Sequence, residues 1–388
     1  MYLLLQSIIV YSLFACLLFA NSNAVSVNQI RLASQSNKWY SLPKGYWICI
    51  VIFVVISGLR YKVGVDYYSY LQDYLSVMNG TFEERQRGIE YGYLFCTQLF
   101  GSLQIHPTIY FAFLAFLQIF FVIKSVKNER DVMPYMMIVI ILGPFYLSWM
   151  NGIRQMIVAC SFVWATQFIV TKDIKKYLLW LCVAYLWHKS SVILIIPYLF
   201  AYYTNIWDKK WLNIFLLCVC LYLGNTPTWI NITENLGGFL NFIGYHSYSE
   251  MMQEITNSAS FQRFSIGPRM VLMLISYFMV ILYYPKVRQF YKHTPIDLFF
   301  KLFFIGVCGY YLFVNTNLLF LRPVQYFDIF ALPMIAYTLA YLKRSSEVSF
   351  RLMILASLSF VYIQSYDDFI LPVTMRHATL FQFYPFFD

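Results

Sequence analysis

Apolar runs of nearly membrane-spanning length recur along the whole chain, and short polar segments separate them. A helix needs about 20 apolar residues to cross a bilayer, and tilt or local thinning accommodates shorter runs. The pattern predicts an all-α polytopic membrane protein, a helical bundle of about twelve spans in one domain over residues 1–388. The predicted spans are Tyr2–Ala20, Gly45–Ser57, Thr108–Ile123, Val132–Trp149, Ile153–Val170, Ile174–Trp187, Ser191–Tyr203, Trp211–Gly224, Pro268–Tyr284, Ile296–Phe313, Val324–Leu342 and Phe350–Gln364.

Tyr91–Gln104 is a thirteenth apolar segment, which we expect to be re-entrant or interfacial; if it crosses, the sides of the loops before or after it exchange. In the non-crossing arrangement, 18 basic and 6 acidic residues fall on the cytoplasmic side, against 10 basic and 12 acidic outside. This asymmetry follows the positive-inside rule. The long loops 58–90 and 225–267 are then extracytoplasmic, with a short surface helix expected near Ser249–Thr256. The loops predicted to be cytoplasmic are Asn21–Lys44, Lys124–Asp131, Lys172–Lys176, Asp208–Lys210, Lys286–Lys292 and Lys343–Arg351.

Composition agrees with a membrane protein, because 60% of the residues are hydrophobic and 12% are charged, against about 25% charged in soluble domains. The net charge of +10 is explained by cytoplasmic loops, so it does not indicate a nucleic-acid partner. The eight cysteines lie mostly inside apolar runs without a C-x-x-C spacing, which favours packing over metal or disulfide roles.

Familiar nucleotide and metal motifs are missing, since the chain has no Walker A, G-x-G-x-x-G, H-E-x-x-H or D-x-D sequence. We therefore expect no cofactor and no metal. The pair Asp367-Asp368 near the C-terminus is expected to be solvated.

Charged residues gather at the predicted outer ends of spans, where the positive-inside rule does not explain the arginines. They come from separate parts of the sequence, so the pattern predicts a polar site at the extracytoplasmic face. The stretch Gly58–Tyr70 forms one wall of it. The residues concerned are Arg60, Asp66, Glu90, Arg154, His188, Arg269 and Arg322.

Arg154 begins a helix directly after Asn151-Gly152. A charge near the membrane interior costs about 2.5–3.5 kcal/mol on insertion scales. The Asn-Gly pair indicates a cap or break, whose free amides could help bind an anion. The alternative is an arginine that reaches the lipid headgroups.

Arg322 precedes Pro323, and Tyr326 follows one turn later. A guanidinium suits bidentate contact with phosphate, and a packing pair with Asp328 is the alternative. Tyrosines such as Tyr67 could provide platforms for sugar rings.

Three side chains are candidates for acid–base chemistry. His188 ends a short helix, and an imidazole can accept a proton from a sugar hydroxyl near neutral pH. A hydrogen-bonded structural histidine is the alternative. Asp66 and Glu90 could act as base, bind sugar hydroxyls, or pair with Arg60 or another arginine.

The order of these motifs resembles the EpsG-type family of bacterial polysaccharide polymerases, which is related in role to the Wzy O-antigen and capsule polymerases. One difference is Val65, where the family commonly has threonine, which removes one hydroxyl. The resemblance covers roughly residues 45–345 and rests on Gly58-Leu-Arg60 with Val63-Gly-Val-Asp-Tyr67 and Tyr70, Glu90-Tyr-Gly-Tyr93, Gly152-Ile-Arg-Gln155 with Ala159, Lys175-Lys176 before His188-Lys-Ser-Ser191 and Pro197, and Arg322-Pro-Val-Gln-Tyr326.

The resemblance implies a metal-independent glycosyltransferase in the bacterial cytoplasmic membrane. It would join polyprenyl-pyrophosphate-linked oligosaccharides at the outer face, with membrane lipid and a chain-length regulator protein as further partners. Arg60, Arg154, Arg322, Tyr67 and Tyr326 would then bind the pyrophosphate and glycan. A lipid-linked glycan flippase and a membrane acyltransferase are the alternative functions. A flippase should carry charges along a path through the membrane, whereas here they gather at one face.

Overall fold

The structure is a computed structural model that describes residues 1–28, 42–82, 90–200, 209–233, 267–316, 318–371 and 378–385. It is 81% helical, and its one described sheet pairs the short strands β1 (Arg60–Tyr61) and β2 (Gln382–Phe383) antiparallel. The helices that this article discusses are α1 (Tyr2–Asn28), α2 (Lys44–Gly58), α3 (Tyr67–Met78), α4 (Tyr91–Ser102), α5 (Pro107–Ser125), α6 (Met133–Leu142), α7 (Phe145–Met150), α8 (Ile153–Val170), α9 (Ile174–Trp187), the 3₁₀ helix η2 (Lys189–Leu194), α10 (Ile195–Phe200), α11 (Lys210–Leu223), α14 (Pro268–Phe290), α15 (Ile296–Phe313), α16 (Leu318–Asp328), α17 (Ala331–Ser345), α18 (Glu347–Leu358) and α19 (Phe360–Ile370).

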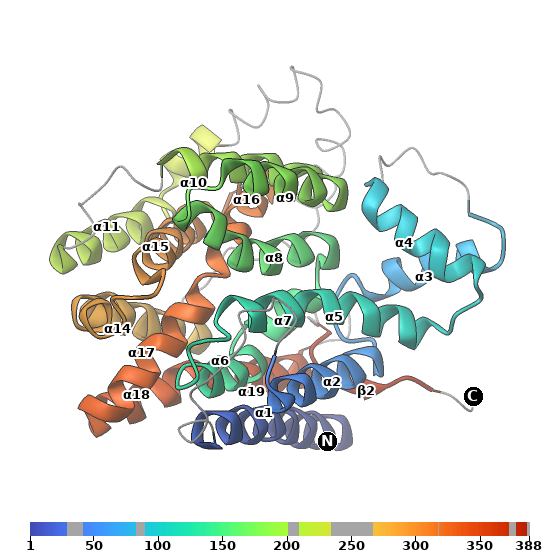
Figure 1. Cartoon of the computed structure of the whole chain (residues 1–388), viewed down its shortest axis with the longest axis horizontal. Helices are drawn as coiled ribbons and strands as arrows, with labels where there is room; N and C mark the ends of the chain where they lie inside the picture. The colour runs from blue at the N-terminus through green and yellow to red at the C-terminus, as the bar shows by residue number, and fades with distance from the viewer. Residues whose placement is uncertain are drawn as a thin grey trace.

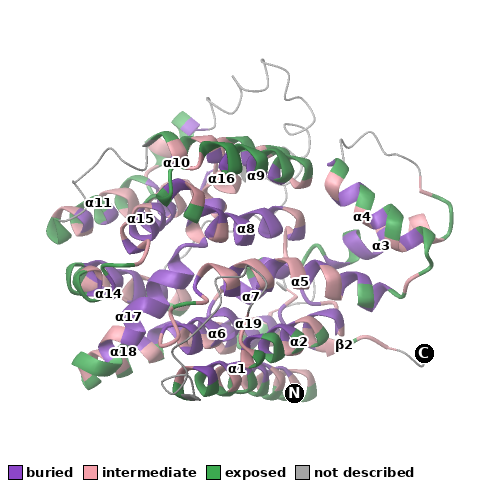
Figure 2. Ribbon diagram, viewed as in Figure 1, coloured by how far each residue is buried: buried purple, intermediate pink, exposed green. Residues whose placement is uncertain are grey.

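The helices stack in layers. Helices α1, α2, α5, α8 and α9 follow one another upward in Figure 1, each packed on the next. The innermost helices, such as α8 and α17, are largely buried, whereas α1 and α9 expose one side (Figure 2). Because the exposed faces are themselves apolar, this arrangement is typical of helices whose outer surface meets lipid.

Six described helical segments are long and apolar enough to cross a membrane, and a seventh is present if α11 and Pro227–Thr233 form one bent span. The all-α membrane architecture is confirmed, but the predicted count of about twelve spans is not. Two predicted spans are interrupted: α6 and α7 divide at Gly143-Pro144, and α16 and α17 divide at Ile329-Phe330. Proline at the first break disfavours a helical residue before it.

The segment predicted to be re-entrant forms α4, whose 12 residues are too few for a span. It packs against α3 and α9, and Figure 1 shows α3 and α4 together at one edge of the molecule. Helix α3 was not predicted and lies within the loop 58–90. Most of the loop 225–267, with the surface helix expected near Ser249–Thr256, lies outside the described residues.

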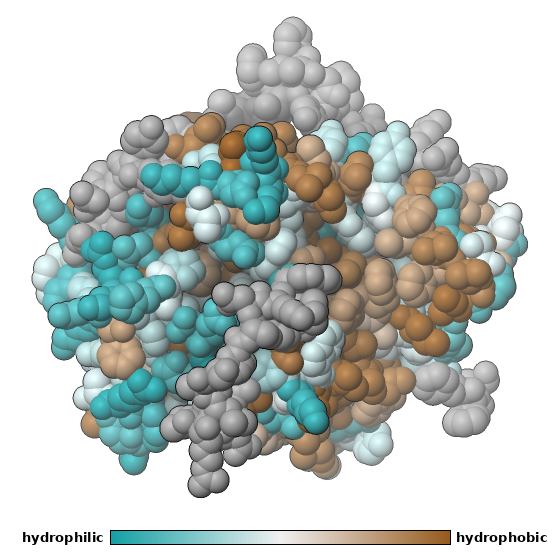
Figure 3. Space-filling view, viewed as in Figure 1, coloured by the Kyte–Doolittle hydropathy of each residue, from teal (hydrophilic) through white to brown (hydrophobic). Residues whose placement is uncertain are grey.

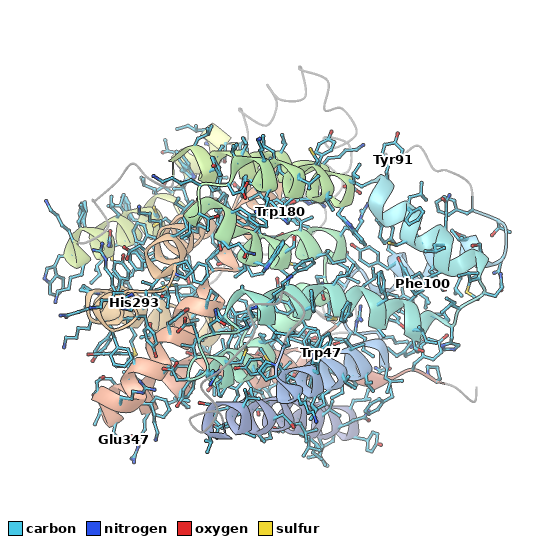
Figure 4. All side chains as sticks on the ribbon, viewed as in Figure 1. Trp47, Tyr91, Phe100, Trp180, His293 and Glu347 are labelled. Carbon is cyan, nitrogen blue, oxygen red and sulfur yellow. The ribbon has the colours of Figure 1, made fainter. Side chains whose placement is uncertain are left out.

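Three loops predicted to be cytoplasmic meet at the opposite end. Asp131 forms an ion pair with Arg344 at 3.2 Å and accepts a hydrogen bond from the Tyr291 hydroxyl at 2.5 Å. His293 and Glu347 lie at this end, while Tyr91 and Phe100 lie at the other (Figure 4). In Figure 3, which has the same view, hydrophilic residues gather on the left, where His293 and Glu347 lie in Figure 4. The loops therefore share one end of the molecule, and which side of the membrane that end faces stays a prediction.

The C-terminal acidic pair is not simply solvated, contrary to the expectation from sequence. Asp368 is fully buried and accepts hydrogen bonds from the Thr379 amide at 2.7 Å and the Thr379 hydroxyl at 2.6 Å. Asp367 pairs with Arg269 at 3.2 Å. Residues 378–385 lie against α19, where Asp368 satisfies the backbone amide of Thr379.

Candidate functional site

Arg154 lies in the first turn of α8, directly after the left-handed residue Gly152. Its guanidinium Nη1 donates to Glu90 Oε2, and it lies over the ring of Tyr93, 5.2 Å from the ring centroid. The Arg154 side chain is 30% exposed. The charge at this helix start is therefore paired and still reaches the surface.

Glu90 immediately precedes α4 and connects two segments that are distant in sequence. Its second oxygen, Oε1, contacts His188 Nδ1 at 2.7 Å, where α9 ends. The side chains of Glu90 and His188 are only 8% and 12% exposed. One buried carboxylate thus binds an arginine with one oxygen and a histidine with the other.

The charge state of Glu90 follows from these contacts. Burial alone would raise the pKa of its carboxyl group, but the hydrogen bond from His188 and the charge of Arg154 lower that pKa to about 2. An ionised carboxylate only accepts hydrogen bonds, so the Nδ1 atom of His188 carries the hydrogen. In the neutral imidazole, Nε2 is then left with the lone pair that can accept a proton.

A pair of turns fixes the start of α8. Asp66 Oδ2 accepts a hydrogen bond from the Gly152 amide at 2.9 Å, and Asn151 Oδ1 accepts one from the Val65 amide at 2.6 Å. Gly64 has a φ of +98°, and a Cβ atom there would lie 2.7 Å from the Met150 carbonyl oxygen. We call residues 64–66 and 150–152 the clasp. Because Asp66 occupies the Gly152 amide, that amide is not free for an anion, contrary to the expectation from sequence.

Helix α16 forms the other wall of the site and packs against α8 and η2. The Gln155 side-chain amide donates to the carbonyl oxygen of Arg322, and the Ser190 hydroxyl is 2.9 Å from the Tyr326 hydroxyl. Tyr326 is fully buried. Residues next to Arg154 and His188 therefore fix the part of α16 that carries Arg322.

Residues 45–375 match the EpsG family. The chain belongs to the EpsG family. This is a family of polysaccharide polymerase-like membrane proteins. Neither a curated protein nor a solved structure matches the chain.

In this EpsG-family chain, the structure separates the site residues that were predicted from sequence. Glu90, Arg154 and His188 are in direct contact, and backbone hydrogen bonds connect Asp66 and Arg322 to the start of α8. Arg269 pairs with Asp367 instead. Arg60 and Tyr67 occupy a buried environment of their own, with both side chains near the ring of Phe111.

Three residues that hydrogen-bond within this part of the structure were not among the predicted site residues. They are Asn151 in the clasp, Gln155 beneath Arg322, and Ser190 beside Tyr326. Each lies within three residues of a predicted charged residue, so the motifs Asn-Gly-Ile-Arg-Gln and His-Lys-Ser-Ser contained the signal. Their partners are distant in sequence and could not be identified without the fold.

Proposed function

We propose that this protein polymerises lipid-linked glycans at the extracytoplasmic face of the bacterial cytoplasmic membrane. It would transfer a growing glycan from polyprenyl pyrophosphate to a hydroxyl group of the next lipid-linked repeat unit. One observation carries the proposal: Glu90 holds Arg154 and His188 at the same time, so an anion-binding group and a proton acceptor are fixed together. Membership of the EpsG family supports it.

In the proposed reaction, His188 Nε2 takes the proton from the acceptor hydroxyl. The hydroxyl oxygen attacks the anomeric carbon of the donor, and the bond from that carbon to the pyrophosphate oxygen breaks. The lipid pyrophosphate leaves with the bonding electrons. Arg154 and Arg322 stabilise its negative charge, because guanidinium groups match phosphate oxygens.

Glu90 would act on His188 rather than on the substrate. A carboxylate that contacts Nδ1 holds the imidazole in one tautomer and stabilises the cation formed when Nε2 is protonated. With a pKa of about 2 and both oxygens engaged, Glu90 is a poor base. Asp66 caps the start of α8, which favours a positioning role for it as well. Among the three candidates from sequence, His188 is therefore the proposed base.

The substrate assignment follows from chemistry that is available outside the cytoplasm. Nucleotide sugars are absent there, whereas a lipid-pyrophosphate sugar carries its own leaving group. The contacts between charged residues lie at helix ends rather than along a path through the bundle, which favours an enzyme over a flippase. We expect a chain-length regulator protein as a partner.

The test is the length of the polymer that cells make. Arg154→Ala, Arg322→Ala and His188→Ala should each leave single repeat units and no ladder, at normal protein levels. Arg351→Ala is the matched control, because that arginine is exposed and pairs with Glu347 one turn away. Full-length polymer from all three site variants would contradict the site. Lipid-linked units that accumulate on the cytoplasmic side would indicate a flippase.

A further inference from the structure

Arg60 is a charged residue without a charged partner in the described chain. It lies in β1, directly after α2, and its side chain is 1% exposed. Nη1 donates to the Ser57 carbonyl oxygen at 2.7 Å. The Nε and Nη2 atoms are also buried, and neither has a hydrogen-bond partner among the described residues.

Three hydroxyl groups, which can each donate a hydrogen bond, lie around Arg60. The buried hydroxyls of Ser57 and Tyr146 interact with each other, and the buried Tyr67 hydroxyl has no hydrogen-bond partner within the described part of the chain. The centroid of the Tyr67 ring lies 5.7 Å from the guanidinium carbon of Arg60, and Tyr146 interacts with Arg60 electrostatically. Buried polar groups are nearly always satisfied, so the two guanidinium nitrogens of Arg60 that lack a partner among the described residues call for an acceptor.

The geometry of the guanidinium suggests which acceptor fits. The hydrogens on Nε and Nη2 point in the same direction and form a fork that matches two oxygens of a phosphate or carboxylate group. The guanidinium carbon lies over the ring of Phe111, 4.9 Å from the ring centroid. The Nε and Nη2 atoms of the fork are the part of Arg60 that lacks a partner among the described residues.

We propose that Arg60 and the hydroxyls of Ser57, Tyr67 and Tyr146 form a second oxyanion site, which takes one phosphate of a lipid diphosphate. This inference rests on the proposed function. A reaction between two lipid-linked glycans involves two diphosphates, one on the donor and one on the acceptor. The Arg154 group binds one of them, and Arg60 binds the other.

In this structure the second site is closed by residues 378–385, which we call the C-terminal strap. Strand β2 of the strap pairs with β1, placing Phe383 opposite Arg60. The strap is also held to α1, where the Tyr11 hydroxyl donates to the Thr379 carbonyl at 2.7 Å and the Ser7 hydroxyl oxygen accepts from the Phe381 amide at 2.7 Å. Displacement of the strap is the step that would admit a diphosphate to Arg60.

The direct test is binding of inorganic pyrophosphate to the purified full-length protein in detergent, measured by calorimetry. We expect two classes of site in the wild type. Arg60→Lys keeps the charge but removes the fork, and it should weaken one class at least tenfold, whereas Arg154→Lys should weaken the other. Arg351→Lys is the control. Unchanged stoichiometry and affinity in Arg60→Lys would overturn the proposal.

A milder variant covers the case in which Arg60→Lys fails to fold. Tyr146→Phe removes a single hydroxyl, which interacts with Ser57 and Arg60, so the melting temperature should change little while pyrophosphate affinity at the second class falls several-fold. Unchanged affinity in a folded Tyr146→Phe protein counts against the site. Asp368→Ala removes both side-chain hydrogen bonds to Thr379, and it should speed pyrophosphate association at this class. An unchanged association rate would contradict the role given to the strap.

Two further experiments distinguish a lipid diphosphate from a lipid headgroup as the ligand, and the second site from the proposed function. In nanodiscs, phosphatidylglycerol in place of phosphatidylcholine should leave Arg60-dependent pyrophosphate binding unchanged. Competition by phosphatidylglycerol would assign the site to lipid headgroups and overturn the substrate assignment. If cells with Arg154→Ala, Arg322→Ala or His188→Ala all make full-length polymer, the proposed site fails, yet the calorimetric comparison of Arg60→Lys with wild type still decides the second site.

Discussion

Arg60 precedes one segment of the clasp and Arg154 follows the other, and the two arginines have contrasting environments. Arg154 is partly exposed and is paired with a carboxylate that also holds His188. Arg60 is buried, and no described carboxylate pairs with it. The first arrangement is complete without substrate, and the second lacks an acceptor. The difference indicates that one arginine belongs to a preassembled reaction centre and the other to a site that an anion completes.

The largest expected effect comes from leaving Arg154 without a charged carboxylate partner, as Arg60 is in the described part of the chain. Glu90→Gln removes the charge that pairs with Arg154 and the anion that stabilises protonated His188. General-base catalysis contributes about 10²–10⁴-fold, so we expect the initial rate of glycan transfer to fall by at least about 10²-fold. The measurement uses purified protein with a synthetic lipid-linked repeat unit.

Glu347→Gln is the control for this change, since Glu347 is an exposed carboxylate that also contacts two cations, Lys343 and Arg351. Its transfer rate should match the wild type. A Glu90→Gln protein with near wild-type rate would show that the carboxylate is structural and would remove the proposed link between Arg154 and His188.

The second test acts on the clasp between the two regions. Gly64 and Gly80 both have positive φ, but only Gly64 is packed against another backbone, and nothing lies within 4 Å of a Cβ atom at Gly80. Left-handed backbone alone costs an alanine about 1–2 kcal/mol, so Gly80→Ala should lower the free energy of unfolding by about 1 kcal/mol. Gly64→Ala adds the contact with Met150 and should cost roughly 2–4 kcal/mol.

Unfolding in detergent, followed by circular dichroism, compares the two alanine variants directly. Gly64→Ala should also lower the transfer rate, because the clasp sets the start of α8 and hence Arg154. Equal losses in the two variants would mean that the approach of Gly64 to Met150 is not needed for the fold.

The sequence predicted the components of the reaction centre but not their pairing. Positive-inside bias marked Glu90, Arg154 and His188 as residues of one membrane face, and the structure brings them into contact. Nothing in the sequence distinguished Arg60 from Arg154, because burial depends on the packing of distant segments. The same holds for Asp368, whose partner Thr379 lies in a segment that hydropathy does not mark as its neighbour.

The fold was predictable in class and less so in detail. Uniformly apolar runs identified a helical membrane protein, but a run such as Val132–Trp149 reads as one span although it divides into α6 and α7 at Gly143-Pro144. Hydropathy averages over such a break. Helix α3 escaped prediction for the opposite reason, because its polar residues resemble a loop until the helix packs on α4.

A third test separates a positioning role of Asp66 from a role as base. Asp66→Asn keeps a side-chain oxygen that can accept from the Gly152 amide, whereas Asp66→Ala does not. If Asp66 positions α8, the asparagine variant should retain most transfer activity. The alanine variant should lose about tenfold in rate and about 1 kcal/mol in stability, as for a solvent-accessible hydrogen bond that is removed. Loss of activity in both variants, with normal stability of Asp66→Asn, would make Asp66 the base.

The smallest expected effect is the dependence of stability on pH, and it distinguishes the two arginine environments. The pKa of Glu90 is lowered from 4.5 to about 2 in the folded protein. A lowered carboxyl pKa gives stability that is present above the unfolded value and is lost as pH falls toward the folded one. Between pH 7 and pH 3.5 this group should cost the wild type roughly 1 kcal/mol of unfolding free energy. Arg60 contributes no comparable dependence there, because no described carboxylate pairs with it. Chemical unfolding at the two pH values should therefore show a smaller drop in unfolding free energy for Glu90→Gln than for wild type. Arg60→Lys should keep the wild-type drop. Equal drops in Glu90→Gln and wild type would mean that Glu90 is not held ionised by His188 and Arg154.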